Sequence, residues 1–214
     1  SDICRHIWNW YLGESAEPVR VSYEDGDVRA LVSDTLKDER NRIHASYRAS
    51  TQGEQILPDL LEAMIIEAES KKESNAERGD FTNPSQLELP FALAAMGDSS
   101  VDALADSLAH SDWWVRAAAA AALGAMGSGA YTAAEALGKA LKDENEWVRR
   151  NAAEALGNVG VKAEAVVSDL LEALEDRRPV SRWSLSSDGF RENVMMALLK
   201  IIPDYRRDLF PVFR

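Results

Sequence analysis

The chain has little of what most catalytic and metal sites are built from. Its 214 residues include a single cysteine, Cys4, and three histidines, His6, His44 and His110. One cysteine excludes an internal disulfide bond and favours a reducing compartment, so we expect a cytoplasmic protein. None of the histidines has His-Glu or His-x-x-x-His spacing, and Cys4 with His6 lacks the second ligand pair of a zinc site. We therefore predict no metal, no cofactor and no enzymatic activity.

Basic residues and long apolar runs are also scarce. The 24 Lys and Arg residues face 36 Asp and Glu residues, which gives a net charge of −12. Because nucleic-acid affinity depends largely on neutralising phosphates, this balance argues against binding DNA or RNA. The longest apolar run, around residues 117–126, is mostly alanine and falls short of the roughly 18 to 20 residues that a membrane span needs. With no basic segment followed by an apolar one at its start, the chain is predicted to be soluble and to carry no secretory signal.

What the sequence does contain is a repeat. The segment "HSDWWVRAAAAAALGAMG", residues 110–127, recurs as "DENEWVRRNAAEALGNVG", residues 143–160, with a constant offset of 33 positions. The offset continues into residues 164–175, and an insertion of nine residues then changes it to 42, which relates Asn151 to Asn193. Self-similarity at such a period indicates an array of stacked supersecondary units.

Each unit carries two helical patterns. Val148, Ala152 and Leu156 lie on one stripe of a helix, and residues 166–174 repeat the pattern in the following segment. Ser111 or Asp112 can cap such a helix, and glycines that follow it can end it in the left-handed conformation. Since one hairpin leaves its apolar stripe exposed, stacking is required. The expected helix pairs are 28–37 with 40–49, 54–69 with 85–97, 100–109 with 112–126, 132–141 with 145–159, and 164–175 with 189–202.

The quoted segments resemble the short HEAT-like repeats of phycobilisome lyases and many bacterial proteins, with a polar cap, Val-Arg, small residues and Leu-Gly. The period is shorter than the roughly 40 to 47 residues of long HEAT and armadillo repeats, and the ankyrin signature is absent. The resemblance implies an all-α, right-handed α-solenoid of about five HEAT-like helical hairpins. We expect one domain, 1–214, with degenerate repeats and a cap in 1–86, clear repeats in 87–202, and a C-terminal cap or tail in 203–214.

The resemblance also implies an Asp/Arg ladder between successive repeats. Asp112 with Arg116 and Asp188 with Arg191 have the spacing of that ladder. We interpret both pairs as structural, and contact with a ligand is the alternative.

In HEAT-like arrays the exposed stripe of the second helices lines the concave surface where partners usually bind. In the earlier repeat this stripe is mostly alanine, which fits either a smooth strip for a partner helix or packing against the chain's own neighbouring segment. The loops 70–86 and 176–189 are longer than the fold requires. The second loop holds a small basic patch, which either binds an anionic partner or stays solvated or paired with nearby residues. The predicted partner-binding residues are Trp114, Trp147, Arg150, Asn151, Glu154, Arg178, Arg182 and Trp183. For at least one of Trp113, Trp114 and Trp147, we expect burial between repeats instead.

The predicted function is a non-enzymatic protein–protein interaction module that binds its partner on the concave face. Because the chain is acidic, we expect that partner to carry a basic patch. The resemblance leaves an alternative, a subunit like the phycobilin lyases that holds a bilin in the concavity. A HEAT-like DNA glycosylase is disfavoured by the charge of −12.

Overall fold

The computed structural model describes residues 89–176, 178 and 189–202, together with residues 57, 58, 60–62, 64–66 and 68. Every regular element among these residues is a helix, so the all-α prediction is confirmed for this part of the chain. The α-helices are α5 (Leu89–Ala95), α6 (Val101–Ser107), α7 (Trp113–Met126), α8 (Ala134–Ala140), α9 (Glu146–Val159), α10 (Val167–Leu174) and α11 (Gly189–Ile201). The 3-10 helices η3 (Gly97–Ser100), η4 (Gly127–Ala133) and η5 (Gly160–Val166) lead into α6, α8 and α10.

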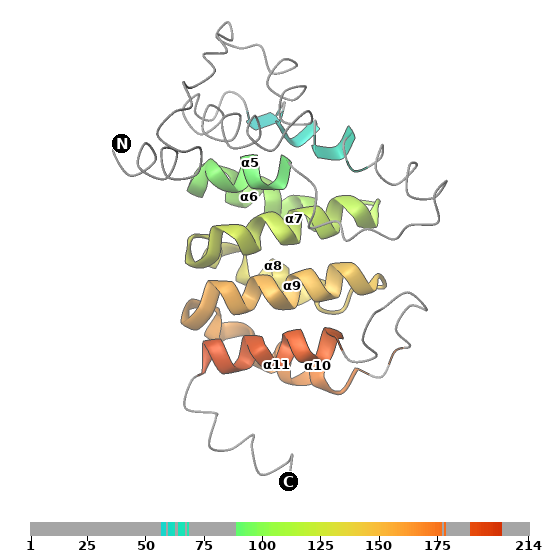
Figure 1. Ribbon diagram of the computed structural model, residues 1–214, viewed down its shortest axis with the longest axis vertical. Helices are drawn as coiled ribbons and strands as arrows, with labels where there is room; N and C mark the ends of the chain where they lie inside the picture. The colour runs from blue at the N-terminus through green and yellow to red at the C-terminus, as the bar shows by residue number, and fades with distance from the viewer. Residues whose placement is uncertain are drawn as a thin grey trace, which may run out of the picture.

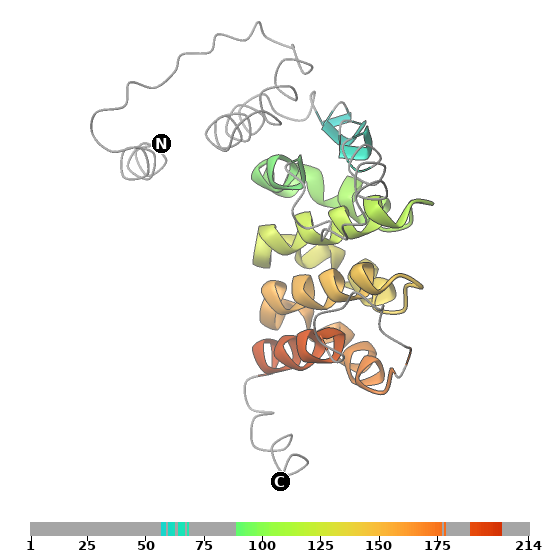
Figure 2. The ribbon, with the colours of Figure 1, turned by 45° about the vertical axis from the view of Figure 1, so that its right-hand side comes forward.

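The helices form two layers. Helices α5, α7, α9 and α11 lie one above another in what we call the second-helix layer (Figure 1). Helices α6, α8 and α10 form the first-helix layer beside it, as the turned view shows (Figure 2). Each short helix packs against the longer helix that follows it, giving the hairpins α6/α7, α8/α9 and α10/α11. The result is a helical repeat arrangement.

The three hairpins lie where the sequence predicts them. The first helices are shorter than expected, because η4 and η5 occupy the start of each predicted segment and contain a non-helical alanine, Ala130 or Ala163. Of the predicted pair 54–69 with 85–97, the described residues between 57 and 68 are helical and α5 covers part of the second member. The predicted pair 28–37 with 40–49 lies outside the described residues.

Side-chain caps and glycines set the ends of the long helices. Asp112 Oδ1 accepts a hydrogen bond from the Trp114 backbone N–H at 2.9 Å, and Asn145 Oδ1 accepts one from Trp147 N–H at 2.9 Å. Asp112 is therefore the cap, not Ser111. Gly127 (φ 57°, ψ −131°) and Gly160 (φ 71°, ψ −146°) end α7 and α9 at positive φ. Their ψ values lie far from the predicted left-handed helical region, in a conformation almost restricted to glycine.

Small residues allow the second-helix layer to pack closely. A Cβ placed on Gly124 of α7 would lie 3.2 Å from Ala155 Cα of α9, and one on Gly157 would lie 3.1 Å from Ala197 Cα of α11. Within the alanine run 117–122, residues 117–120 and 122 are fully buried. Of the two interpretations of the alanine stripe, packing within the array therefore holds for Ala117 and Ala118, while Ala125 remains exposed.

The core runs through the array without interruption. The largest fully buried side chains include Leu123, Leu156 and Leu198, which occupy one position of successive repeats. Leu60 and Met64 join the same core from the described residues that precede α5. Within the described part of the chain, no helix is both long enough and apolar enough to cross a membrane.

Candidate interaction surface

A buried ion pair joins the hairpin α6/α7 to the next one. Arg116 Nε and Nη2 donate to Asp143 Oδ2 and Oδ1 at 2.7 and 2.9 Å. The Arg116 Nη1 group donates to the carbonyl oxygens of His110 and Ser111, both at 3.0 Å. Only 10% of the Arg116 side chain and 11% of the Asp143 side chain are exposed. The hydrogen bond to Asp143 raises the pKa of Arg116, so this contact holds a permanent charge pair between two repeats.

The same contact recurs 33 residues later with looser geometry. Arg149 Nη1 donates to the carbonyl oxygens of Asp143 and Glu144, both at 2.9 Å, and Arg149 Nε lies 3.5 Å from Asp176 Oδ2. Burial lowers the pKa of Arg149, and the nearby positive charge of Arg178 lowers it further. The guanidinium carbon also lies 5.4 Å from the centre of the Phe190 ring, which favours the cation. We call the contacts Arg116–Asp143 and Arg149–Asp176 the ladder.

Arg178 completes this edge of the array. It stands 33 positions after Asn145, where the preceding repeats have a helix cap. Its Nε and Nη2 groups bind the Asp176 carboxylate at 2.7 to 3.0 Å, and its Nη1 donates to the carbonyl oxygens of Lys142 and Asp143. The side-chain hydrogen bonds from Arg178 are the main cause of the lowered pKa of Asp176. The guanidinium is therefore occupied in joining α10 to the preceding hairpin.

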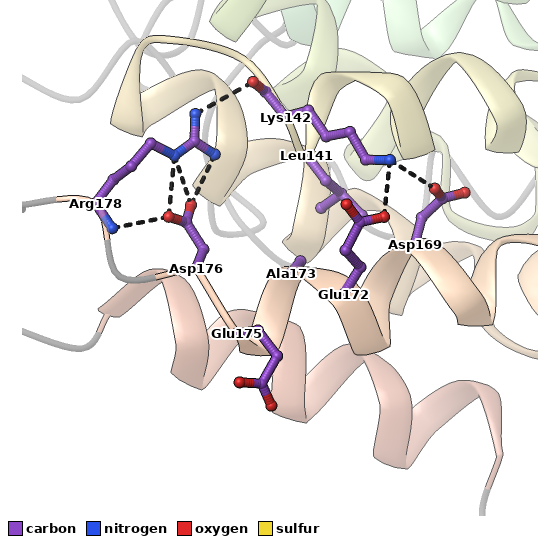
Figure 3. Close-up of a pocket in the computed structure, with 8 residues that line it drawn as sticks. All are labelled: Leu141, Lys142, Asp169, Glu172, Ala173, Glu175, Asp176 and Arg178. Carbon is purple, nitrogen blue, oxygen red and sulfur yellow. Dashed lines mark hydrogen bonds and ion pairs between the residues drawn. The ribbon is translucent and has the colours of Figure 1, made fainter.

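A cleft of about 310 Å³ lies beside Arg178, between the end of α8 and helix α10. Lys142 Nζ lies 3.4 Å from Asp169 and 2.9 Å from Glu172, and the bond to Glu172 is the main cause of its raised pKa. Figure 3 shows the Lys142 ammonium with its two carboxylates and the Arg178 guanidinium with Asp176 and the Lys142 carbonyl oxygen, while the Glu175 carboxylate points away from both groups. Both cations of the cleft are thus held by acidic side chains and are poorly placed to bind an anion.

Asparagine side chains connect the helices of the second-helix layer. Asn151 Nδ2 of α9 donates to Ala117 O of α7 at 3.0 Å, and Asn193 Nδ2 of α11 donates to Arg150 O of α9 at 3.2 Å. Since Ala117 and Arg150 are 33 positions apart, this is one contact made twice. Each bond satisfies a donor and an acceptor at the contact between two repeats.

A groove of about 230 Å³ opens between α7 and α9 on this layer. Its floor is formed where Gly124 and Ala155 approach each other, so no bulky side chain fills it. We call it the α7–α9 groove, and its lining residues are Ala121, Gly124, Ala125, Asn151, Glu154, Ala155 and Asn158.

Comparison with known proteins identifies the repeat. Residues 101–187 match the family model of HEAT repeats. This region is a HEAT-repeat region. Among solved structures, the chain is similar to the crystal structure of an engineered protein, at 20% identity over 82% of this chain and 79% of that chain, with a TM-score of 0.40. No curated protein matches the chain. The resemblance seen in the sequence is confirmed for residues 101–187.

Two residues predicted to lie exposed on the HEAT-repeat surface are buried instead. Trp114 is 4% exposed, belongs to the core and lies against Trp113, with ring centres 5.0 Å apart. Asn151 is also 4% exposed, because its amide is used between α7 and α9. The prediction of exposure is wrong for both, and the alternative of burial between repeats, expected for at least one tryptophan, holds for Trp114. The close packing through glycine and alanine buries a wider stripe of each helix.

The other predicted residues are spread over different environments. Trp147 and Arg150 are half-buried, and the Arg150 guanidinium lies 5.1 Å from the Trp147 ring centre. Glu154 is exposed at the α7–α9 groove. Arg178 is exposed too, but on the ladder edge, so the structure does not bring it into this groove. Arg182 and Trp183 lie outside the described residues.

The ladder of the HEAT repeats uses other acidic partners than the sequence suggests. The spacing pairs Arg116 with Asp112, yet the carboxylate that Arg116 binds at 2.7 Å belongs to Asp143 of the next hairpin. Asp112 caps α7, and Asp188 lies outside the described residues. Arg116 and Arg149, like Asp143 and Asp176, are 33 positions apart, and this shared offset is the signal in the sequence that could have found the observed pairs.

One histidine falls within the described residues and has a structural role. The Nδ1 atom of His110 accepts a hydrogen bond from the Asp112 backbone N–H at 3.1 Å. In the next repeat, 33 positions later, Asp143 Oδ1 accepts the equivalent bond from Asn145 N–H at 2.7 Å. In the part of the chain that the structure describes, no group of three His, Cys, Asp or Glu side chains is placed to hold a metal ion. Cys4, His6 and His44 lie outside it.

Proposed function

We propose that the chain is a non-enzymatic interaction module, a right-handed α-solenoid of about five HEAT-like hairpins that binds another protein on its second-helix layer. The observation that carries this proposal is the α7–α9 groove, which opens on that layer of the HEAT-repeat region. The polar side chains of the ladder and the asparagines Asn151 and Asn193 instead form hydrogen bonds within the array. They support a rigid framework for a binding surface.

Charge supports the kind of partner. The chain carries a net charge of −12, and Glu154 adds an exposed carboxylate at the groove. A basic partner surface would be attracted to such a module, and the association rate would fall as salt screens the charges. The proposed partner therefore carries a basic patch.

A display selection of random peptides tests the proposal. The peptides are selected on the immobilised full chain at low salt, and bound peptides are then measured at about 50 and 500 mM salt, where screening differs strongly. We expect enrichment of basic peptides whose affinity falls with salt. These peptides should compete with one another for binding to the second-helix layer. Failure to enrich any peptide, or enrichment of acidic peptides only, would overturn it. A bilin titration followed by absorbance addresses the lyase-like alternative, and saturable binding would replace the proposal.

A further inference from the structure

We infer that the α7–α9 groove is a receptor for an arginine or lysine side chain of the partner protein, with Asn151 Oδ1 and the Glu154 carboxylate as its acceptors. This inference rests on the proposed interaction function and names the chemistry of its site. It is carried by an acceptor without a protein donor, by the neutral walls of the groove and by the contacts that already hold the nearby charges.

The first acceptor is the amide oxygen of Asn151, a residue that is mostly buried but lines the groove. The hydrogen bond from its amide nitrogen to Ala117 O fixes the orientation of the amide group. The amide oxygen, on the opposite side of that group, therefore points away from Ala117. Asn151 is 4% exposed and lines the groove, yet among the described residues no donor meets this oxygen. The oxygen is not enclosed, so it reaches the space of the groove, where a donor from a ligand can bind it in place of water.

Glu154 places a negative charge beside that oxygen. Asn151 and Glu154 are three positions apart on α9, so their side chains share one side of the helix. Glu154 is exposed, and no salt bridge engages it within the described part of the chain. Together the two residues offer acceptors and one negative charge, which suits a cationic donor and repels a carboxylate.

The remaining walls provide methyl groups and no charge. Ala121, Ala125 and Ala155 contribute their methyl groups. Asn158 uses its amide nitrogen on Gly124 O at 3.2 Å, and its oxygen accepts from Lys200 Nζ at 3.0 Å. A ligand that fits these walls has an apolar stem and a positively charged end, as arginine and lysine side chains do.

The nearest cations of the second-helix layer are already engaged. Lys200 is held by Asn158, and Arg150 stacks on Trp147 and lies 3.6 Å from Glu146. Neither one neutralises Glu154 by a direct contact. The acceptors of the groove are therefore available to a cation from outside the chain.

The test uses nuclear magnetic resonance of the ¹⁵N-labelled full chain and a short alanine-based helical peptide with one central arginine. A lysine peptide is the second probe, and a peptide with citrulline, which has the shape of arginine without its charge, is the control. We expect saturable shifts at Ala121, Ala125, Asn151 and Glu154 with at least one cationic peptide. The citrulline peptide should bind at least about fivefold more weakly, since it loses the charge-assisted bonds.

Matched variants separate the groove from general charge attraction. Glu154→Gln removes the charge, and Ala125→Leu fills the groove from an exposed position; each should weaken the cationic peptide at least about fivefold. Glu164→Gln and Ala165→Leu make the same changes at exposed positions of η5 and should leave affinity unchanged. Melting curves confirm that all four variants remain folded.

Equal binding of the citrulline peptide, or undiminished binding by Glu154→Gln and Ala125→Leu, would overturn the receptor. So would shifts confined to the first-helix layer. These results would leave the proposed function standing if the display selection still enriches basic peptides. An empty selection would instead remove the proposed function itself.

Discussion

Removing the negative charge of Asp143 should strongly destabilise the array, although the substitution changes the side chain very little in size. Asp143→Asn keeps the shape of the side chain and an oxygen for the Asn145 N–H, but it turns an amide donor toward the Arg116 donors. Breaking a buried pair from one side typically costs about 3 to 5 kcal/mol because the remaining charge is left without compensation. Arg116 retains two carbonyl acceptors and lies 3.5 Å from Glu144 Oε1, so part of that cost is recovered. We expect a loss of about 2 to 4 kcal/mol.

Urea unfolding at pH 7, followed by far-ultraviolet circular dichroism, measures this loss. Asp106→Asn, at an exposed position of α6, is the matched control and should change stability by less than about 0.5 kcal/mol. Arg116→Met, alone and combined with Asp143→Asn, completes a double-mutant cycle, and we expect a coupling of at least about 1 kcal/mol. A loss no larger than that of the control, or additive effects in the cycle, would refute the view that Arg116 and Asp143 stabilise the array as a pair.

Three further outcomes follow from the packing and the charges. Leu156→Ala, at a fully buried position, should cost about 2 to 5 kcal/mol in thermal or urea unfolding, and an unchanged melting temperature would show that the helix phase is wrong. Gly157→Leu should cost at least about 2 kcal/mol, because even a Cβ there lies 3.1 Å from Ala197 Cα; no effect would mean that α9 and α11 separate freely. Arg178 lowers the pKa of Asp176 in the folded chain, so its stabilisation is present above the unfolded value of about 3.9 and is lost as pH falls toward the folded value. When the free energy of unfolding is measured as pH is lowered, Asp176→Asn should therefore lose less stability below about pH 4 than the unmodified chain. An equal slope for the two proteins would contradict a stabilising role of the Asp176 carboxylate.

The local elements could be predicted from the sequence, because their causes lie within a few residues. The stripe that contains Leu156 predicts a helix and its buried face, and Leu156 is indeed fully buried. Asp112 and Asn145 precede the long helices and cap them, and Gly127 and Gly160 follow and end them. The offset of 33 then predicts stacking, since a single hairpin cannot cover its own apolar stripe.

The width of the buried stripe could not be predicted in this way. Trp114 and Asn151 lie at positions that an isolated helix would expose, and both are 4% exposed in the array. The deciding quantity is the distance between neighbouring helices, which Gly124 and Ala155 make unusually short. Helical periodicity gives the direction of a side chain but not the distance to the next helix.

The candidate site divides in the same manner. From the sequence came the repeat, the capped helices and the acidic charge, and the resemblance to HEAT-like repeats added the second helices as the expected binding side, with Glu154 among the residues named. Only the tertiary structure decided that Asn151 turns its amide nitrogen to Ala117 and that the groove opens beside Glu154. It also paired Arg116 with Asp143, 27 positions away in the next hairpin. The physical reason is that hydrogen bonds and grooves depend on atoms from separate repeats, whose relative placement is fixed by packing rather than by local sequence.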